Sequence, residues 1–150
     1  MLRDRFMSDL KEAMKAGDKP RLGTIRLMQA ALKDKDIEAR GAGKGPLSDD
    51  EILQLLQKMV KQRQESAKMY SDGGRPELAE QETAEIAVIT AYLPKQMDEA
   101  EAKAAIAAVI AETGASGVKD MGKVMGELKA RYAGQMDFGK ASPLVKQLLG

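Results

Sequence analysis

The sequence predicts an all-α protein with a four-helix N-terminal unit, residues 1–94, and a smaller three-helix C-terminal unit, residues 95–150. Nearly every segment repeats apolar residues at the three- and four-residue spacing of an amphipathic helix. No segment alternates β-branched or aromatic residues with polar ones, as a strand does. The boundary is expected in the motif YLPKQM, because Pro94 ends the helical pattern before it.

The first helix is expected over residues 1–16, with Gly17 as its left-handed stop. Asp18 can cap a second helix that ends near Arg40, and Pro20 suits its first turn, where a missing N–H does no harm. The residues expected to face inward are Leu2, Phe6, Leu10, Ala13 and Met14 in the first helix and Leu22, Ile25, Met28 and Leu32 in the second.

A glycine-rich linker, residues 41–46, precedes the third helix. It is a poor match to a phosphate-binding loop, because Gly45 follows the lysine where a hydroxyl residue should stand. Ser48 and Glu51 have capping-box spacing and predict a third helix that runs to about Tyr70. Its expected inward residues are Ile52, Leu55, Leu56, Met59, Val60, Ala67 and Tyr70.

Two further helices are bounded by proline, glycine and acidic residues. Pro76 begins a fourth helix that is expected to run to Leu93. Asp98, with Glu101 three residues later, predicts the start of an alanine-rich fifth helix, which Gly114 ends.

The last two helices are expected at residues 119–132 and in the segment ASPLVKQLL. We expect the final helix to be short, with Ser142 as its N-cap and Pro143 at its first position. A longer helix capped by Asp137 would place the proline in its interior, where a proline is destabilising.

The composition favours a binding module over an enzyme. The chain has no histidine and no cysteine, so the commonest nucleophiles, general bases and zinc ligands are missing. An enzyme would have to use carboxylates, lysines or tyrosines alone.

The net charge is +1, no apolar run is long enough to span a membrane, and the N-terminus does not resemble a signal peptide. We therefore expect a cytoplasmic protein.

Three charged residues fall inside the apolar stripes of the third and fourth helices: Arg63, Glu82 and Glu85. If these helices form an antiparallel hairpin, Arg63 faces both glutamates, which predicts a structural ion pair. The alternative is acid-base chemistry by the same three groups. In the separate segment 33–40, Asp34, Asp36 and Glu38 have calcium-loop spacing, but the glycine and distal glutamate of an EF-hand are missing, so we expect a solvated helix face.

The sixth helix contains two glycines four residues apart. Its apolar residues gather on one face, which we expect to be buried: Met121, Val124, Met125, Leu128 and Tyr132. The opposite face carries Lys119, Gly122, Lys123, Gly126 and Ala130. Glycines there would allow the phosphates of a polyanion to approach the backbone closely. The alternative is that another helix of the chain packs on this face.

Four stretches of the chain resemble the YqeY-like proteins: RLGTIRLMQAALKDKDIE, QRQESAKMYSDGGRPELAEQETAEIAVITAYLPKQM, DMGKVMGELKARYAG and GKASP. That family is related to the C-terminal helical and tail region of GatB, the B subunit of the tRNA-dependent amidotransferase. The resemblance covers essentially the whole chain, and its most specific parts are Glu82 to Pro94 and Met121 to Met125.

The resemblance implies a tRNA-binding accessory module in translation, whose C-terminal unit is similar to the GatB tail. The implied contacts to tRNA, or to a tRNA-bearing complex, are Lys119, Gly122, Lys123, Gly126, Lys129, Arg131 and Lys140. GatB's catalytic cradle has no counterpart here. A label of glutamine-dependent carbon–nitrogen ligase would therefore be inherited from the larger subunit.

Two other functions stay open at this point. The chain could be a protein-interaction module that docks on an amidotransferase or an aminoacyl-tRNA synthetase. It could also be an accessory enzyme of amide transfer that uses Arg63, Glu82 and Glu85. No ATP, glutamine or metal motif is present, so no cofactor, metal or membrane partner is expected.

Overall fold

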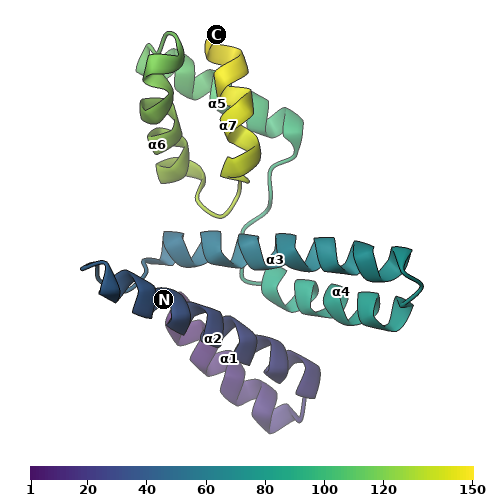
Figure 1. Cartoon of the computed structure of the whole chain (residues 1–150). Helices are drawn as coiled ribbons and strands as arrows, with labels where there is room; N and C mark the ends of the chain where they lie inside the picture. Colours follow the sequence, from purple (N-terminus) through teal and green to yellow (C-terminus); the bar gives the residue numbers. More distant parts are fainter. The chain divides into compact units, whose positions relative to one another are not determined.

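The computed structural model describes all 150 residues and contains seven α-helices, one short 3-10 helix and no strand (Figure 1). The predicted all-α fold class is confirmed. The chain divides into two compact units, Met1–Leu93 and Pro94–Gly150. No helix combines the length and the apolar character needed to cross a membrane.

The N-terminal unit consists of two helical hairpins (Figure 1). Its helices are α1 (Leu2–Ala16), α2 (Lys19–Gly41), α3 (Asp49–Asp72) and α4 (Pro76–Thr90). Helix α1 packs against α2, α3 packs against α4, and α4 also packs against α2.

The predicted caps of these helices are present. Gly17 ends α1 in the left-handed conformation with φ 67°, and the Asp18 side chain accepts a hydrogen bond from the Arg21 backbone N–H at the start of α2. Ser48 and Glu51 form both hydrogen bonds of a capping box at the start of α3. These local interactions satisfy N–H and C=O groups that a helix end leaves free.

Apolar side chains from all four helices and the turn after α4 form one core. Its buried members are Leu2, Phe6, Met28, Leu32, Ile52, Leu55, Leu56, Met59, Ile89 and Tyr92. Met14 was expected to face inward but is 54% exposed. This expectation is wrong because α2 is the only helix that packs extensively against α1.

Tyr92 anchors the end of α4 to α1. Its ring lies edge-on to the Phe6 ring, with centroids 5.0 Å apart, and the Arg5 guanidinium lies 4.6 Å from its centroid. The Tyr92 hydroxyl donates a hydrogen bond to the Asp9 carboxylate, and burial followed by this bond raises the pKa of Tyr92. Helix α4 therefore ends at Thr90 and not at Leu93 as predicted, since Tyr92 turns toward α1.

Asp36 joins α1, α2 and the segment before α3. Its carboxylate accepts two hydrogen bonds from Arg3, of 2.7 and 2.8 Å, and one of 3.0 Å from the Leu47 backbone N–H. The Arg3 bond, followed by the Leu47 bond, lowers the pKa of Asp36 to about 2. The expectation of a purely solvated face at residues 33–40 is thus wrong at this position, because Arg3 comes from a different helix.

The C-terminal unit contains α5 (Glu99–Thr113), the 3-10 helix η1 (Val118–Asp120), α6 (Met121–Tyr132) and α7 (Phe138–Leu149). The three α-helices all pack against one another. Val124 and Leu128 of α6 are fully buried, and Met121, Met125 and Tyr132 pack against the same core. The predicted buried face of the sixth helix is therefore confirmed.

The prediction of a short last helix that starts at Ser142 is wrong. Helix α7 starts at Phe138, and the Asp137 side chain caps it by accepting hydrogen bonds from the backbone N–H groups of Gly139 and Lys140. Pro143 lies inside the helix. The cap and the burial of Ala141 and Val145 in the core offset the hydrogen bond that Pro143 cannot donate.

We predict that Asp36→Asn lowers the free energy of unfolding by about 1 kcal/mol at pH 7, because it removes the charge that pairs with Arg3 in a bidentate, partly exposed ion pair. A pKa that is lower in the folded state stabilises the fold above the unfolded-state pKa of about 4. That stabilisation is lost as the pH falls toward 2. Urea unfolding should thus separate wild type from variant at pH 7 and not at pH 2.

Asp34→Asn is the matched control, because Asp34 is an exposed carboxylate on the same helix. We expect it to change stability by less than about 0.5 kcal/mol at either pH. Equal losses for the two variants would show that Asp36 has no special contribution.

Candidate functional site

The exposed face of α6 carries the two glycines that the sequence singled out. Gly122, Gly126 and Ala130, which we call the glycine strip, are all exposed. A Cβ atom added to either glycine would meet no atom within 4 Å. No segment of the C-terminal unit covers the glycines, so internal helix packing does not account for them.

Two of the cations beside the glycine strip have partners within the C-terminal unit, and only Arg131 is neutralised by carboxylates. Lys123 donates a hydrogen bond of 3.1 Å to the carbonyl of Thr113, at the end of α5. Arg131 forms ion pairs with Glu112 at 2.5 Å and Glu127 at 2.8 Å, and the hydrogen bonds to these carboxylates raise the pKa of Arg131. The strip therefore does not present a continuous cationic surface.

The other predicted contact residues do not complete such a surface. Lys119 lies in η1 and Lys129 on α6, and both are exposed. Lys140 lies on the first turn of α7, where it lines a pocket.

Arg63 and Glu85 meet across the α3–α4 hairpin, and Glu82 does not join them. Arg63 Nε donates to Glu85 Oε2 at 3.0 Å, and another guanidinium nitrogen donates to the Met59 carbonyl at 3.3 Å. Both paired side chains are less than a fifth exposed. The guanidinium charge of Arg63 is therefore paired with Glu85, and this ion pair joins α3 to α4.

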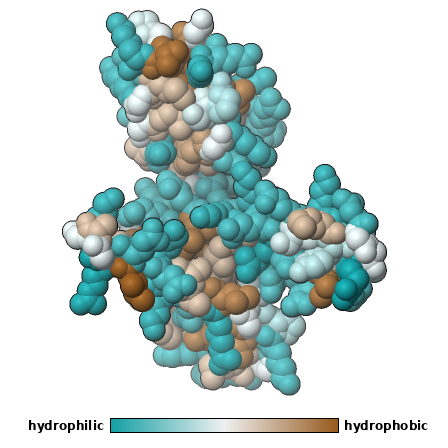
Figure 2. Space-filling view, in the orientation of Figure 1, coloured by the Kyte–Doolittle hydropathy of each residue, from teal (hydrophilic) through white to brown (hydrophobic).

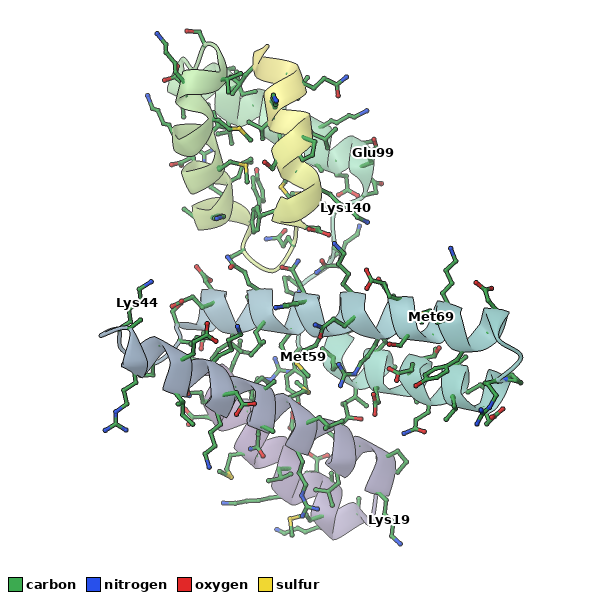
Figure 3. The ribbon with its side chains drawn as sticks, in the orientation of Figure 1. Lys19, Lys44, Met59, Met69, Glu99 and Lys140 are labelled. Atoms are coloured by element: carbon green, nitrogen blue, oxygen red, sulfur yellow. The ribbon has the colours of Figure 1, made fainter.

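A pocket of about 530 Å³ lies in the C-terminal unit, at the ends of α5 and α7 from which these helices start. Apolar side chains line it, and polar and charged groups stand beside them, among them Glu99 and Lys140, which Figure 3 labels. The apolar lining residues are Met97, Ala102, Met136, Ala141 and Leu144. The polar lining residues are Gln96, Asp98, Glu99, Gln135, Asp137 and Lys140.

Hydrogen bonds hold the walls of this pocket in place. The Met97 N–H donates to the Gln135 carbonyl at 2.8 Å, and the Gln96 side chain donates to the Gly134 carbonyl. These bonds tie the segment before α5 to the loop between α6 and α7. Gly134 has φ 80°, a conformation that favours glycine. The pocket is therefore formed before any partner arrives.

The rim of the pocket is acidic. Asp98 caps α5 by accepting a 2.7 Å hydrogen bond from the Glu101 backbone N–H, and Asp137 caps α7. Glu99, which pairs with Lys103 at 3.4 Å, adds a third carboxylate, and Lys140 is the one cation among the lining residues. Such a rim attracts cationic groups and disfavours phosphates.

Sequence reasoning named Asp98 and Lys140 but missed the pocket. Its lining comes from two segments that are distant in the sequence: 96–102 and 135–144. The sequence feature that could have indicated the pocket is the pair of aspartates, Asp98 and Asp137, at two helix starts. The prediction that Ser142 caps the last helix left Asp137 out of this pair.

Comparison with known proteins identifies the family. Residues 3–149 match the family described as "Yqey-like protein". The chain belongs to the YqeY-like family. This finding agrees with the resemblance seen in the sequence motifs.

Curated relatives from fungi share one name, "Altered inheritance of mitochondria protein 41, mitochondrial". The relative from Pyrenophora tritici-repentis is 28% identical over 149 residues, which cover 97% of this chain and 80% of the relative. The relative from Eremothecium gossypii is 36% identical over 85 residues, covering 57% of this chain and 45% of the relative. A Clavispora lusitaniae relative is 36% identical over 94 residues, covering 61% and 52%.

These comparisons correct two expectations. A tRNA-binding accessory role related to the amidotransferase is wrong, since the relatives are named for the inheritance of mitochondria and not for tRNA or amide transfer. The expectation of a cytoplasmic protein is wrong as well, because the relatives' names place those proteins in mitochondria.

We predict that Gly122→Ala and Gly126→Ala each raise the free energy of unfolding by about 0.5 to 1 kcal/mol. Both positions lie inside α6 with open space around the new methyl group, so the gain in helix propensity meets no steric cost. Thermal and urea unfolding of the single variants measure the gain.

Gly134→Ala is the matched control, because it adds the same methyl group where φ is 80°. We expect it to destabilise the protein by about 1 to 2 kcal/mol. A loss of stability in either α6 variant would show that the glycine strip is covered in solution.

Proposed function

We propose that this protein is an adaptor that binds other proteins, and that its four-helix and three-helix units act as separate modules. The C-terminal unit takes an apolar side chain of a partner, flanked by a basic residue, into the pocket beside α5 and α7. The observation that carries the proposal is the combination of an apolar lining and an acidic rim in one preformed pocket.

The apolar lining supports binding of an aliphatic anchor. Enclosing a leucine-sized side chain contributes roughly 1.5 to 3 kcal/mol. The pocket volume of about 530 Å³ accommodates such a group together with part of the adjoining backbone. The hydrogen-bonded walls reduce the ordering that binding requires, which favours affinity.

The acidic rim supports the choice of a basic flank. Asp98 and Asp137 are held by the helix starts that they cap, so their carboxylates stay at the pocket. A lysine or arginine next to the anchor would meet opposite charge, which favours encounter and selects against acidic segments. Rim charges of this exposed kind contribute about 1 kcal/mol or less each.

We predict that the peptide acetyl-Arg-Leu-Arg-amide shifts the amide NMR signals of Met97, Ala102 and Leu144, which line the pocket. Acetyl-Glu-Leu-Glu-amide should shift them far less, because its charges repel the rim. Glu99→Lys should weaken binding of the basic peptide about fivefold, from the loss of about 1 kcal/mol of attraction. Titrations of the full chain measure these affinities.

Glu101→Lys is the matched control, since Glu101 lies in the same first turn of α5 but outside the pocket. Both reversals oppose the helix dipole, and Glu99→Lys also removes the exposed 3.4 Å ion pair of Glu99 with Lys103, which contributes little to stability. In cells, a photoreactive amino acid at position 99 should crosslink to a protein, and the same group at the exposed Ala107 should not. Equal behaviour of the paired positions would contradict the proposal.

A further inference from the structure

Helices α3 and α4 extend well beyond the core of the N-terminal unit. No side chain from Val60 to Val88 is buried, whereas Met59 and Ile89, on either side of this stretch, are 5% and 0% exposed. We call residues 60–88 the arm; its two helices pack against each other (Figure 1). Met69, labelled in Figure 3, is 73% exposed, ten residues along α3 from the buried Met59.

The arm keeps an apolar seam that its two helices cannot cover alone. Half-buried apolar residues continue the stripes of both helices: Val60, Ala67 and Tyr70 of α3, and Leu78, Ala79 and Ile86 of α4. Figure 2 shows apolar atoms among hydrophilic ones on the surface of the arm, at the right of the view. A helical stripe of this width is normally covered by more than one neighbour. A third helix on the seam would therefore bury further apolar area.

The charges beside the seam specify the character of that helix. Helix α4 carries four glutamates, at positions 77, 80, 82 and 85, and no lysine or arginine. Glu85 is neutralised by Arg63. Glu82 lies half-buried one turn before Glu85 and has no ion-pair or hydrogen-bond partner in the structure. A carboxylate in that position gains most from a cation that is brought to it.

We infer that the arm binds a helix of a partner protein, with apolar residues of that helix on the seam and a lysine or arginine paired with Glu82. The complex would be a three-helix bundle along α3 and α4. This surface goes beyond the proposed function, which concerns the pocket of the other unit. A basic helix complements the arm in charge, because the arm has an unpaired carboxylate in its seam and an acidic α4.

The test uses the full chain and a synthetic helical peptide of about five turns. Its leucines recur at three- and four-residue spacing, and lysines occupy the flanks. Amide NMR titration should place the shifted signals on the arm, at residues such as Ala67, Leu78 and Ile86. A peptide with glutamate in place of each lysine should not bind.

Glu82→Gln tests the proposed pair, and Glu80→Gln is its matched control. Both remove one negative charge from the same helix, but Glu80 is exposed and lies outside the seam. We expect Glu82→Gln to weaken binding of the lysine peptide about fivefold. Glu80→Gln should change binding less than twofold.

Three results would overturn the inference: no binding of the lysine peptide, equal effects of the two variants, or signal shifts outside the arm. Shifts confined to Met97, Ala102 and Leu144 would support the pocket and reject the arm. Shifts confined to the arm would support the inference, and the pocket is then judged by the titration with acetyl-Arg-Leu-Arg-amide. The two proposals can therefore fail independently.

Discussion

Along α3 and α4, the buried apolar side chains end at Met59 and Ile89. This boundary separates the packed core of the N-terminal unit from the exposed arm. On the core side of this boundary, residues from all four helices and Tyr92 form a core around Phe6 and Ile52. In the arm, α3 and α4 pack mainly against each other. An amphipathic helix is stabilised chiefly by what covers its apolar stripe, so the arm is the part of this unit that most readily gains from a further contact.

In the C-terminal unit, helix starts have two uses. Asp98 and Asp137 satisfy backbone N–H groups of α5 and α7, and the same carboxylates stand on the rim of the pocket. The cap fixes each side chain, and the packing of the helices brings the two caps to one place. The carboxylates that cap the two helices thus also make the rim of the pocket acidic.

The cations of α6 show why charge counted along a sequence can mislead. Lys123 and Arg131 lie near the exposed glycines, yet one binds a carbonyl of α5 and the other binds two carboxylates. Their partners come from the neighbouring helix as well as from α6 itself. The glycines remain open, while the charge of Arg131 is neutralised by carboxylates of α5 and α6.

The sequence by itself determined the all-α class, the caps at Asp18, Ser48 and Asp98, and the buried face of α6, because these depend on residues within one or two turns. It did not determine where α7 starts, since burial of Ala141 and Val145 outweighs the local cost of Pro143. Nor did it reveal that Arg3 binds Asp36, that Glu82 stays unpaired beside Arg63 and Glu85, or that two distant segments line one pocket. Only the tertiary structure decided these features, because each depends on which helices become neighbours and on how far their apolar contact extends.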